Sequence, residues 1–168
     1  MAKTEQKRTG RTKAAAAAPR RRVTQADVLG APGAEPLAPM KAARRSKKLP
    51  ADVARAVRAA LDKKAQDVVV LDLRNTPAFT DFFVLCSGLN VRQVKAIADA
   101  VDETLRGLKL RPAHIEGYDR AEWILMDYFN FIVHVFTPQT RAFYALERLW
   151  GDAEKIEVSD EPTTTRSA

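Results

Sequence analysis

Residues that could carry chemistry gather in the stretch Glu122–Phe136, which reads EWILMDYFNFIVHVF. Three of them, Trp123, Asp127 and His134, stand among apolar residues there. They could form an active site, a hydrogen-bonded cluster inside a core, or a surface that binds another protein. The choice among these three decides whether the chain is expected to be an enzyme.

Two catalytic arrangements can be weighed against the sequence. Cys86 could act as a nucleophile with His134 as its base, but both fall in predicted strands, where a buried cysteine usually behaves as a small hydrophobe. Asp72, Asp81 and Asp127 could hold a metal ion for phosphoryl transfer, but they are scattered singly along the chain. Neither arrangement is favoured, and we expect no catalytic residues.

Metal and cofactor motifs are also missing from the sequence. The two histidines, His114 and His134, do not lie in an HExxH or Cys/His spacing. No GxGxxG or P-loop pattern occurs, and the turn at Ser87-Gly88 is a weak candidate for an anion site before a helix. We therefore expect no metal and no cofactor.

Charge divides the chain into two parts. Residues 1–50 contain 13 Lys and Arg and 3 Asp and Glu, a net charge of +10. Residues 51–168 contain 15 and 18, a net charge of −3. An acidic domain suits a basic protein partner, and a basic extension either contacts nucleic acid or only aids solubility.

The location of the protein is expected from similar arguments. One cysteine permits no internal disulfide, which fits a reducing compartment. No apolar run approaches the roughly 20 residues of a membrane span, and the N-terminus lacks the apolar core of a signal peptide. We expect a cytoplasmic protein without membrane contact. The Arg- and Ala-rich N-terminus leaves an organelle matrix as the alternative.

The elements that would position these residues form one α/β domain over residues 51–158. The apolar periods predict the order α-β-β-α-β-β-β-α, with a mixed sheet of about five strands flanked by helices. Residues 1–50 have no sustained apolar period and are predicted to be disordered, apart from a possible helical turn at Thr24–Leu29. Residues 159–168 are expected to be a flexible tail. The predicted helices and strands are 50–66, 67–73, 82–87, 90–107, 112–116, 122–128, 131–137 and 140–150.

A two-residue turn at Phe129-Asn130 would pair two strands as a hairpin, with Trp123 opposite Phe136. Alternation then places Ile124, Met126, Tyr128, Phe131, Val133 and Val135 on an apolar core face. The other face holds Trp123, Leu125, Asp127, Ile132, His134 and Phe136. That mixture favours an exposed protein contact, while helices covering the face, with His134 inside, remain the alternative.

Residues 67–153 closely resemble the ribosomal silencing factor family, also called the Iojap family. The matching pieces are Asp67, Val70-Leu71-Asp72, Thr80-Asp81-Phe82-Phe83-Val84, Ser87-Gly88, Arg92-Gln93-Val94, Ala96-Ile97-Ala98-Asp99, Glu116-Gly117, Trp123-Ile124-Leu125-Met126-Asp127-Tyr128, Val133-His134-Val135-Phe136, Arg141, Tyr144 and Leu146-Glu147-Arg148-Leu149-Trp150-Gly151-Asp152-Ala153. The family usually has Gly-Asp where this chain has Phe129-Asn130, so a longer turn there stays open.

The resemblance implies a translational repressor rather than an enzyme. Its members bind ribosomal protein fourteen of the large subunit, block joining of the small subunit and lower translation when nutrients are short. Some assist large-subunit assembly in organelles, and free members can form homodimers. The family fold looks like a nucleotidyltransferase fold without its catalytic carboxylates.

The resemblance also implies which residues bind the ribosomal protein. They are Trp123 and Asp127 on the matching strand, with Glu116, Leu125 and His134 as further candidates. Two alternative functions stay open. One is large-subunit assembly, with the basic tail of residues 1–50 binding ribosomal RNA, and the other is a nucleotidyltransferase-like enzyme.

Overall fold

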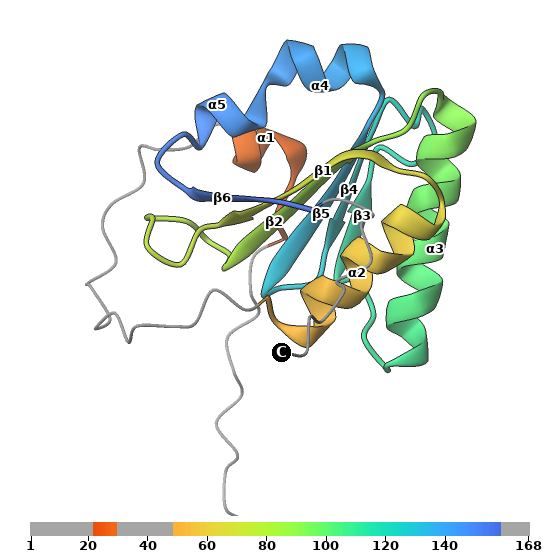
Figure 1. Cartoon of the computed structure of the whole chain (residues 1–168), viewed down its shortest axis with the longest axis horizontal. Coiled ribbons are helices and arrows are strands. Elements are labelled where there is room, and N and C mark those ends of the chain that lie inside the picture. The colour runs from red at the N-terminus through yellow and green to blue at the C-terminus, as the bar shows by residue number, and fades with distance from the viewer. Residues whose placement is uncertain (1–21, 30–48, 159–168) are drawn as a thin grey trace, which may run out of the picture.

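The structure, a computed structural model, describes residues 22–29 and 49–158 (Figure 1). The predictions for the remainder of residues 1–48 and for the tail 159–168 lie outside these ranges. The elements are α1 (Gln25–Leu29), α2 (Ala51–Asp62), β1 (Gln66–Asp72), β2 (Phe82–Ser87), α3 (Val91–Gly107), β3 (His114–Glu116), β4 (Trp123–Asp127), β5 (Phe131–Phe136), α4 (Pro138–Tyr144), α5 (Leu146–Leu149) and β6 (Glu154–Glu157).

The strands form one mixed sheet in the order β3-β4-β5-β2-β1-β6, which confirms the predicted α/β class. β2 and β5 are parallel at its centre, and the other neighbouring strands are antiparallel. The described residues give six strands rather than about five, because β6 pairs with β1 at the edge. Its sequence EKIE has one apolar residue, so it shows none of the alternation that identifies a strand.

α3 follows its local sequence closely. The Asn90 side chain caps the helix by accepting a hydrogen bond from the Gln93 amide at 3.0 Å, as the capping pattern predicts. The helix ends at Gly107, also as predicted. α2 is shorter than expected, since it ends at Asp62 rather than near Gln66.

One further helix prediction is wrong, and one is confirmed. The single helix expected over residues 140–150 is divided into α4 and α5 by Ala145, which has a left-handed φ of 43°. Residues 25–29 form α1, within the segment that the sequence analysis excepted from the predicted disorder. The possible turn predicted at Thr24–Leu29 is confirmed, because Thr24 and Asp27 make reciprocal capping hydrogen bonds.

The register of the β4–β5 hairpin is confirmed. Trp123 lies opposite Phe136, and the two-residue turn is closed by a 3.0 Å hydrogen bond from the Tyr128 amide to the Phe131 carbonyl. Phe129 takes up a φ of 69° to make this turn, so no longer loop is needed.

Hydrophobic side chains pack on both faces of the sheet. α2 and α3 cover one face, while α1, α4 and α5 lie on the other (Figure 1). Among the helices that the structure describes, none is long and apolar enough to cross a membrane. The second, smaller layer of helices decides the environment of the predicted contact residues.

Candidate partner-binding surface

Four of the five predicted contact residues lie together but are buried. Leu125 and His134 are fully buried, Asp127 is 4% exposed and Trp123 is 5% exposed. The expectation that this face is an open contact surface is therefore wrong, and the alternative, that helices cover it, is right. The physical reason is that every residue of β4 and β5 is buried, as in strands packed on both sides.

The covering layer comes from both ends of the described chain. Val28 of α1 and Leu146 of α5 are fully buried against this face, and Trp150 follows them with 6% exposure. The hydrophobic cluster under the layer contains Val28, Val69, Leu71, Leu73, Phe83, Leu85, Trp123, Leu125, Ile132, Phe136, Leu146 and Trp150. The face thus forms a second core.

Trp123 is a packing residue of that core. Its ring stacks on Phe136 at a centroid distance of 5.0 Å and lies under Tyr144 of α4 at 4.9 Å. Its indole Nε1 donates a hydrogen bond to Nδ1 of His134 at 3.2 Å. Trp123 therefore links the sheet to the exposed helix α4.

His134 is the neutral acceptor of this pair. Burial lowers the pKa of His134 to about 3, so the ring is uncharged at neutral pH. Because Nδ1 accepts from Trp123, the ring proton is placed on Nε2. Nε2 has no hydrogen-bond partner among the described residues, and the ring packs edge-on against Phe83 at 4.8 Å. A neutral, enclosed imidazole makes no contact with a partner protein.

This burial predicts acid-sensitive stability. The unfolded chain binds a proton at His134 near pH 6.5 and the folded chain only near pH 3, so stability falls as the pH drops through this window. Between pH 7 and pH 5, His134 is expected to remove about 2 kcal/mol from the free energy of unfolding. Urea unfolding of the wild type and of His134→Gln at both pH values tests this. Parallel losses in the two proteins would contradict it.

Asp127 has a local structural role rather than an exposed charge. Its Oδ1 accepts a 2.8 Å hydrogen bond from the backbone amide of Phe129, the residue with positive φ in the hairpin turn. This Asx-type contact offsets the strain of a non-glycine residue in that conformation. The charged contact expected from the sequence is replaced by a turn-stabilising one.

Asp127→Ala is expected to lower the free energy of unfolding by about 1–2 kcal/mol, because the Phe129 amide loses its acceptor. Asp127→Asn keeps an acceptor oxygen and should lose less than half of that. Urea unfolding of both variants measures the difference. Equal stability of the alanine variant and the wild type would mean that the turn does not depend on this hydrogen bond.

Glu116 is the predicted residue that remains partly accessible. Its side chain is 35% exposed, and Oε2 accepts a 2.8 Å hydrogen bond from the backbone amide of Gln25 in α1. The Gln25 side-chain amide donates in turn to the backbone carbonyl of Trp123 at 2.7 Å. Gly117 leaves room for Gln25 to approach Trp123. A Cβ at this position would lie 2.8 Å from the side-chain amide nitrogen of Gln25 and 2.0 Å from the Trp123 carbonyl oxygen.

The docking of α1 rests on few contacts. α1 has five residues, of which Val28 alone is buried, and full burial of one valine stabilises by roughly 1.5–3 kcal/mol. Fixing the backbone costs roughly 1–2 kcal/mol per residue, and the two hydrogen bonds of Gln25 each add about 1 kcal/mol. For five residues this cost is roughly 5–10 kcal/mol, which is at least as large as the contributions of Val28 and Gln25. Val23 and Leu29, which are partly buried, add packing against the same cluster, so α1 is only marginally held.

An exposed aromatic pair lies on the same side of the sheet. Phe143 is 81% exposed and packs edge-to-face with Tyr144 at 5.0 Å, and no residue of α4 is buried. Phe143 is not among the contact residues predicted from the sequence. The sequence did contain an indication of its exposure. Adjacent residues of a helix point in different directions, so if Tyr144 faces the sheet, Phe143 faces away from it. These two rings are the accessible aromatic surface next to Trp123.

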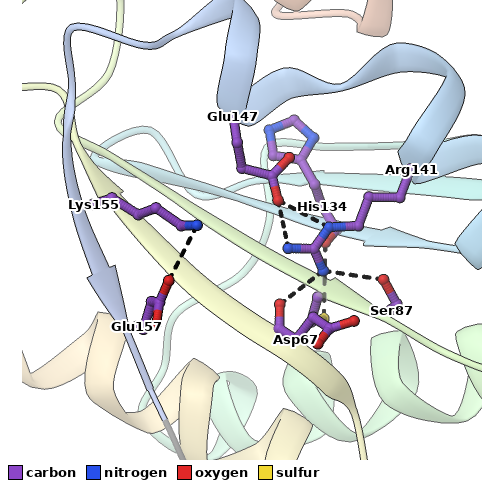
Figure 2. Close-up of polar contacts among 8 residues, drawn as sticks. Asp67, Ser87, His134, Arg141, Glu147, Lys155 and Glu157 are labelled. Carbon is purple, nitrogen blue, oxygen red and sulfur yellow. Dashed lines mark hydrogen bonds and ion pairs between the residues drawn. The ribbon is translucent and has the colours of Figure 1, made fainter.

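Arg141 holds α4 in place although the helix buries none of its residues (Figure 2). Its guanidinium donates to the Asp67 carbonyl at 2.7 Å, to Ser87 Oγ at 3.0 Å and, through Nε, to Glu147 Oε1 at 3.0 Å. One side chain thus joins α4 to α5, β1 and β2. The aromatic pair is presented from this anchored position.

A cleft of about 880 Å³ opens beside Arg141, but its two cationic side chains, Arg141 and Lys155, are paired within the protein. Lys155 forms an ion pair with Glu157 at 3.2 Å, and Arg141 is taken by Glu147. Burial raises the pKa of the nearby Cys86 thiol to about 12, so it stays protonated at neutral pH. The cleft therefore offers neither an unpaired cation for a phosphate nor a reactive thiolate.

Two of the carboxylates considered for metal binding make unrelated contacts. Asp72 pairs with Arg74, while Asp127 serves the hairpin turn. Within residues 22–29 and 49–158, no group of three His, Cys, Asp or Glu side chains is placed to hold a metal ion. At the N-terminus of α3, the Leu89 and Gln93 amides are already bonded to the Gln93 and Asn90 side chains.

Comparisons with known proteins place this arrangement among relatives. A sequence profile described as "Ribosomal silencing factor during starvation" matches residues 46–168. The Ribosomal silencing factor RsfS of Halalkalibacterium halodurans is 41% identical over 103 residues, which are 61% of this chain and 88% of that protein. The protein of that name from Bacillus subtilis is 38% identical over 92 residues, 55% of this chain and 78% of that protein.

Relatives with other names and solved structures also match. Mouse "Mitochondrial assembly of ribosomal large subunit protein 1" is 32% identical over 91 residues, covering 52% of this chain and 40% of that protein. A crystal structure from Bacillus halodurans has a TM-score of 0.57 at 37% identity, covering 63% of this chain and 96% of that one. One from Chromobacterium violaceum has a TM-score of 0.58 at 29% identity, covering 70% and 92%.

Proposed function

The chain belongs to the ribosomal silencing factor family, and we propose that it represses translation by binding the large ribosomal subunit and keeping the small subunit from joining. The observation that carries this proposal is the match of the family profile over residues 46–168, which includes the whole sheet. The family name describes a regulatory role rather than a catalytic one. A ribosome-associated role is common to the relatives' names, including the mouse protein.

The proposed partner on the large subunit is ribosomal protein fourteen, as the sequence resemblance implies. Support for a basic protein partner comes from charge, because residues 51–168 carry a net charge of −3. Complementary charge of this kind speeds association and aligns the partners. Occlusion needs no reaction at the bound surface.

The proposed contact surface lies where β3, β4 and α4 meet. It consists of the exposed rings of Phe143 and Tyr144, the carboxylate of Glu116 and the backbone carbonyl of Trp123. Large aromatic rings beside a directional charge are the composition typical of binding hot spots. The remaining predicted contact residues, Leu125, Asp127 and His134, act from beneath by holding the hairpin and its tryptophan.

A subunit-joining experiment tests the function. Purified large subunits are incubated with an excess of the full chain, small subunits are added with magnesium, and the particles are separated on a sucrose gradient. We expect the protein to co-sediment with large subunits and the joined ribosome peak to fall in proportion to occupancy. Unchanged joining at full occupancy would refute occlusion, and crosslinking to a protein other than ribosomal protein fourteen would refute the assigned partner.

Large-subunit assembly is the second candidate. It is favoured by the similarity to the mouse protein, whose name gives it that role. In an assembly role, cells that lack the protein would accumulate incomplete large subunits during growth. Under the leading proposal, large subunits mature normally in such cells. Loss of the protein then appears as continued joining of large and small subunits when nutrients are short.

A further inference from the structure

α1 covers part of the surface assigned to the ribosomal partner. The backbone amide of Gln25 is bonded to the Glu116 carboxylate, and its side-chain amide is bonded to the Trp123 carbonyl. Gln25, Trp123 and Tyr144 line the same small hollow on this side of the sheet. Figure 1 shows α1 beside α4 and α5, on the face opposite α2 and α3. A protein that binds the Glu116 carboxylate and the Trp123 carbonyl meets α1 first.

α1 does not belong to the part of the chain that the family shares. The family profile begins at residue 46, whereas α1 ends at Leu29. The segment therefore lies outside the range that the profile matches and packs on the matched domain. Its capping hydrogen bonds, between Thr24 and Asp27, are internal to the segment, so none of them ties it to the domain. A helix of five residues is too short to persist alone, so α1 unwinds when it is released.

The contacts that α1 makes with Glu116 and Trp123 are exchangeable. Both are acceptor groups, a carboxylate and a carbonyl, and each receives an N–H donor from Gln25. A basic protein offers donors of the same kind in its Arg, Lys and backbone N–H groups. When the partner replaces α1, both acceptors can again be hydrogen-bonded. The pocket that Val28 leaves is then the one contact of α1 that the partner's N–H donors do not replace.

We infer that α1 is an internal competitor, which occupies the partner-binding surface in the free protein and must be displaced before the ribosomal partner binds. This inference rests on the proposed function, because it concerns the same surface. Affinity is then reduced by the fraction of molecules in which α1 is docked. If α1 is docked in about nine of ten molecules, its release raises the apparent affinity about tenfold.

The test compares two aspartate substitutions in the full chain. Val28→Asp places a carboxylate at a fully buried position and should release α1, while Ala26→Asp adds the same charge at an exposed position of the same helix. Binding to purified large subunits is measured by co-sedimentation at several protein concentrations. We expect Val28→Asp to bind about tenfold more tightly than wild type, and Ala26→Asp to bind like wild type.

A second variant and a second measurement guard against unfolding. Thr24→Ala removes the cap of α1 without touching the sheet and should give a smaller gain in affinity in the same direction. Hydrogen exchange is measured at the amide of residue 28, which is bonded to the Thr24 carbonyl in the docked helix. Exchange there should be faster in Val28→Asp, in Thr24→Ala and in the wild type bound to subunits than in the free wild type.

The outcomes separate the two proposals. Tighter binding with faster exchange in α1 supports competition. Equal affinities for all variants, or slow α1 exchange in the bound wild type, overturn the inference and leave the proposed function standing. If no variant co-sediments with large subunits, the proposed function fails and the competition falls with it.

Discussion

Trp123→Ala is expected to lower the free energy of unfolding by about 3–5 kcal/mol, the usual cost of removing a buried large aromatic side chain. The substitution deletes the stacking on Phe136 and the contact with Tyr144, and it leaves Nδ1 of His134 without its donor. Because a domain of this size is stable by about 5–15 kcal/mol, the loss is a large share of the total.

Urea unfolding followed by circular dichroism measures this loss. Trp123→Phe is the matched control, since it keeps most of the ring contacts and gives up only the hydrogen bond to His134. Its expected loss is about 1–2 kcal/mol. A loss below about 1 kcal/mol for the alanine variant would mean that the ring is not part of the core.

This result changes how a binding defect in Trp123→Ala should be interpreted. The sequence favoured an exposed tryptophan, for which lost binding would identify a contact. With Trp123 only 5% exposed, lost binding follows equally from movement of Tyr144 and α4 above it. The contact surface must be tested with residues whose removal leaves the core intact.

The sequence was sufficient to predict the hairpin and its two faces. Alternation assigns side chains to faces whatever lies beyond the sheet, and the pairing of Trp123 with Phe136 follows from the position of the turn. Phe129 suited this turn poorly on conformational grounds. The structure resolves the conflict through the hydrogen bond from its amide to Asp127.

What covers a face could not be predicted in the same way. The layer over Trp123 is built from α1, α4 and α5, and α1 is separated from β4 by more than ninety residues of sequence, as the bond between Gln25 and Trp123 shows. Local patterns carry no information about such long-range packing. One available indication was the run Phe131–Phe136, which has a single polar residue and so is typical of a strand buried on both faces.

The break between α4 and α5 was not predicted for a related reason. Ala145 adopts a left-handed conformation that its residue type does not favour, so nothing local marks the break. The bond of Arg141 to Glu147 spans the break, and the bond of Arg141 to the Asp67 carbonyl fixes α4 to β1. Tertiary contacts outweigh local propensity here, and the exposed aromatic pair owes its position to them.

The buried tryptophan and the exposed aromatic pair divide two roles that the sequence had assigned to one residue. Trp123 stabilises the face, and Phe143 is free to be buried by a partner. Since the α4 residues make no core of their own, substitutions at Phe143 separate binding from folding in a way that substitutions at Trp123 cannot.

Phe143→Ala is expected to weaken binding to large ribosomal subunits by about 30-fold, which corresponds to the roughly 2 kcal/mol lost at an aromatic hot spot. Its ring is 81% exposed, so the free energy of unfolding should change by less than about 0.5 kcal/mol. The matched control is Leu108→Ala, which removes an exposed hydrophobic side chain beside α3, on the other face of the sheet. Co-sedimentation titrations of both variants, each with its unfolding curve, give the comparison. Wild-type affinity in Phe143→Ala would remove α4 from the contact surface, and an equal loss in Leu108→Ala would place the partner across both faces.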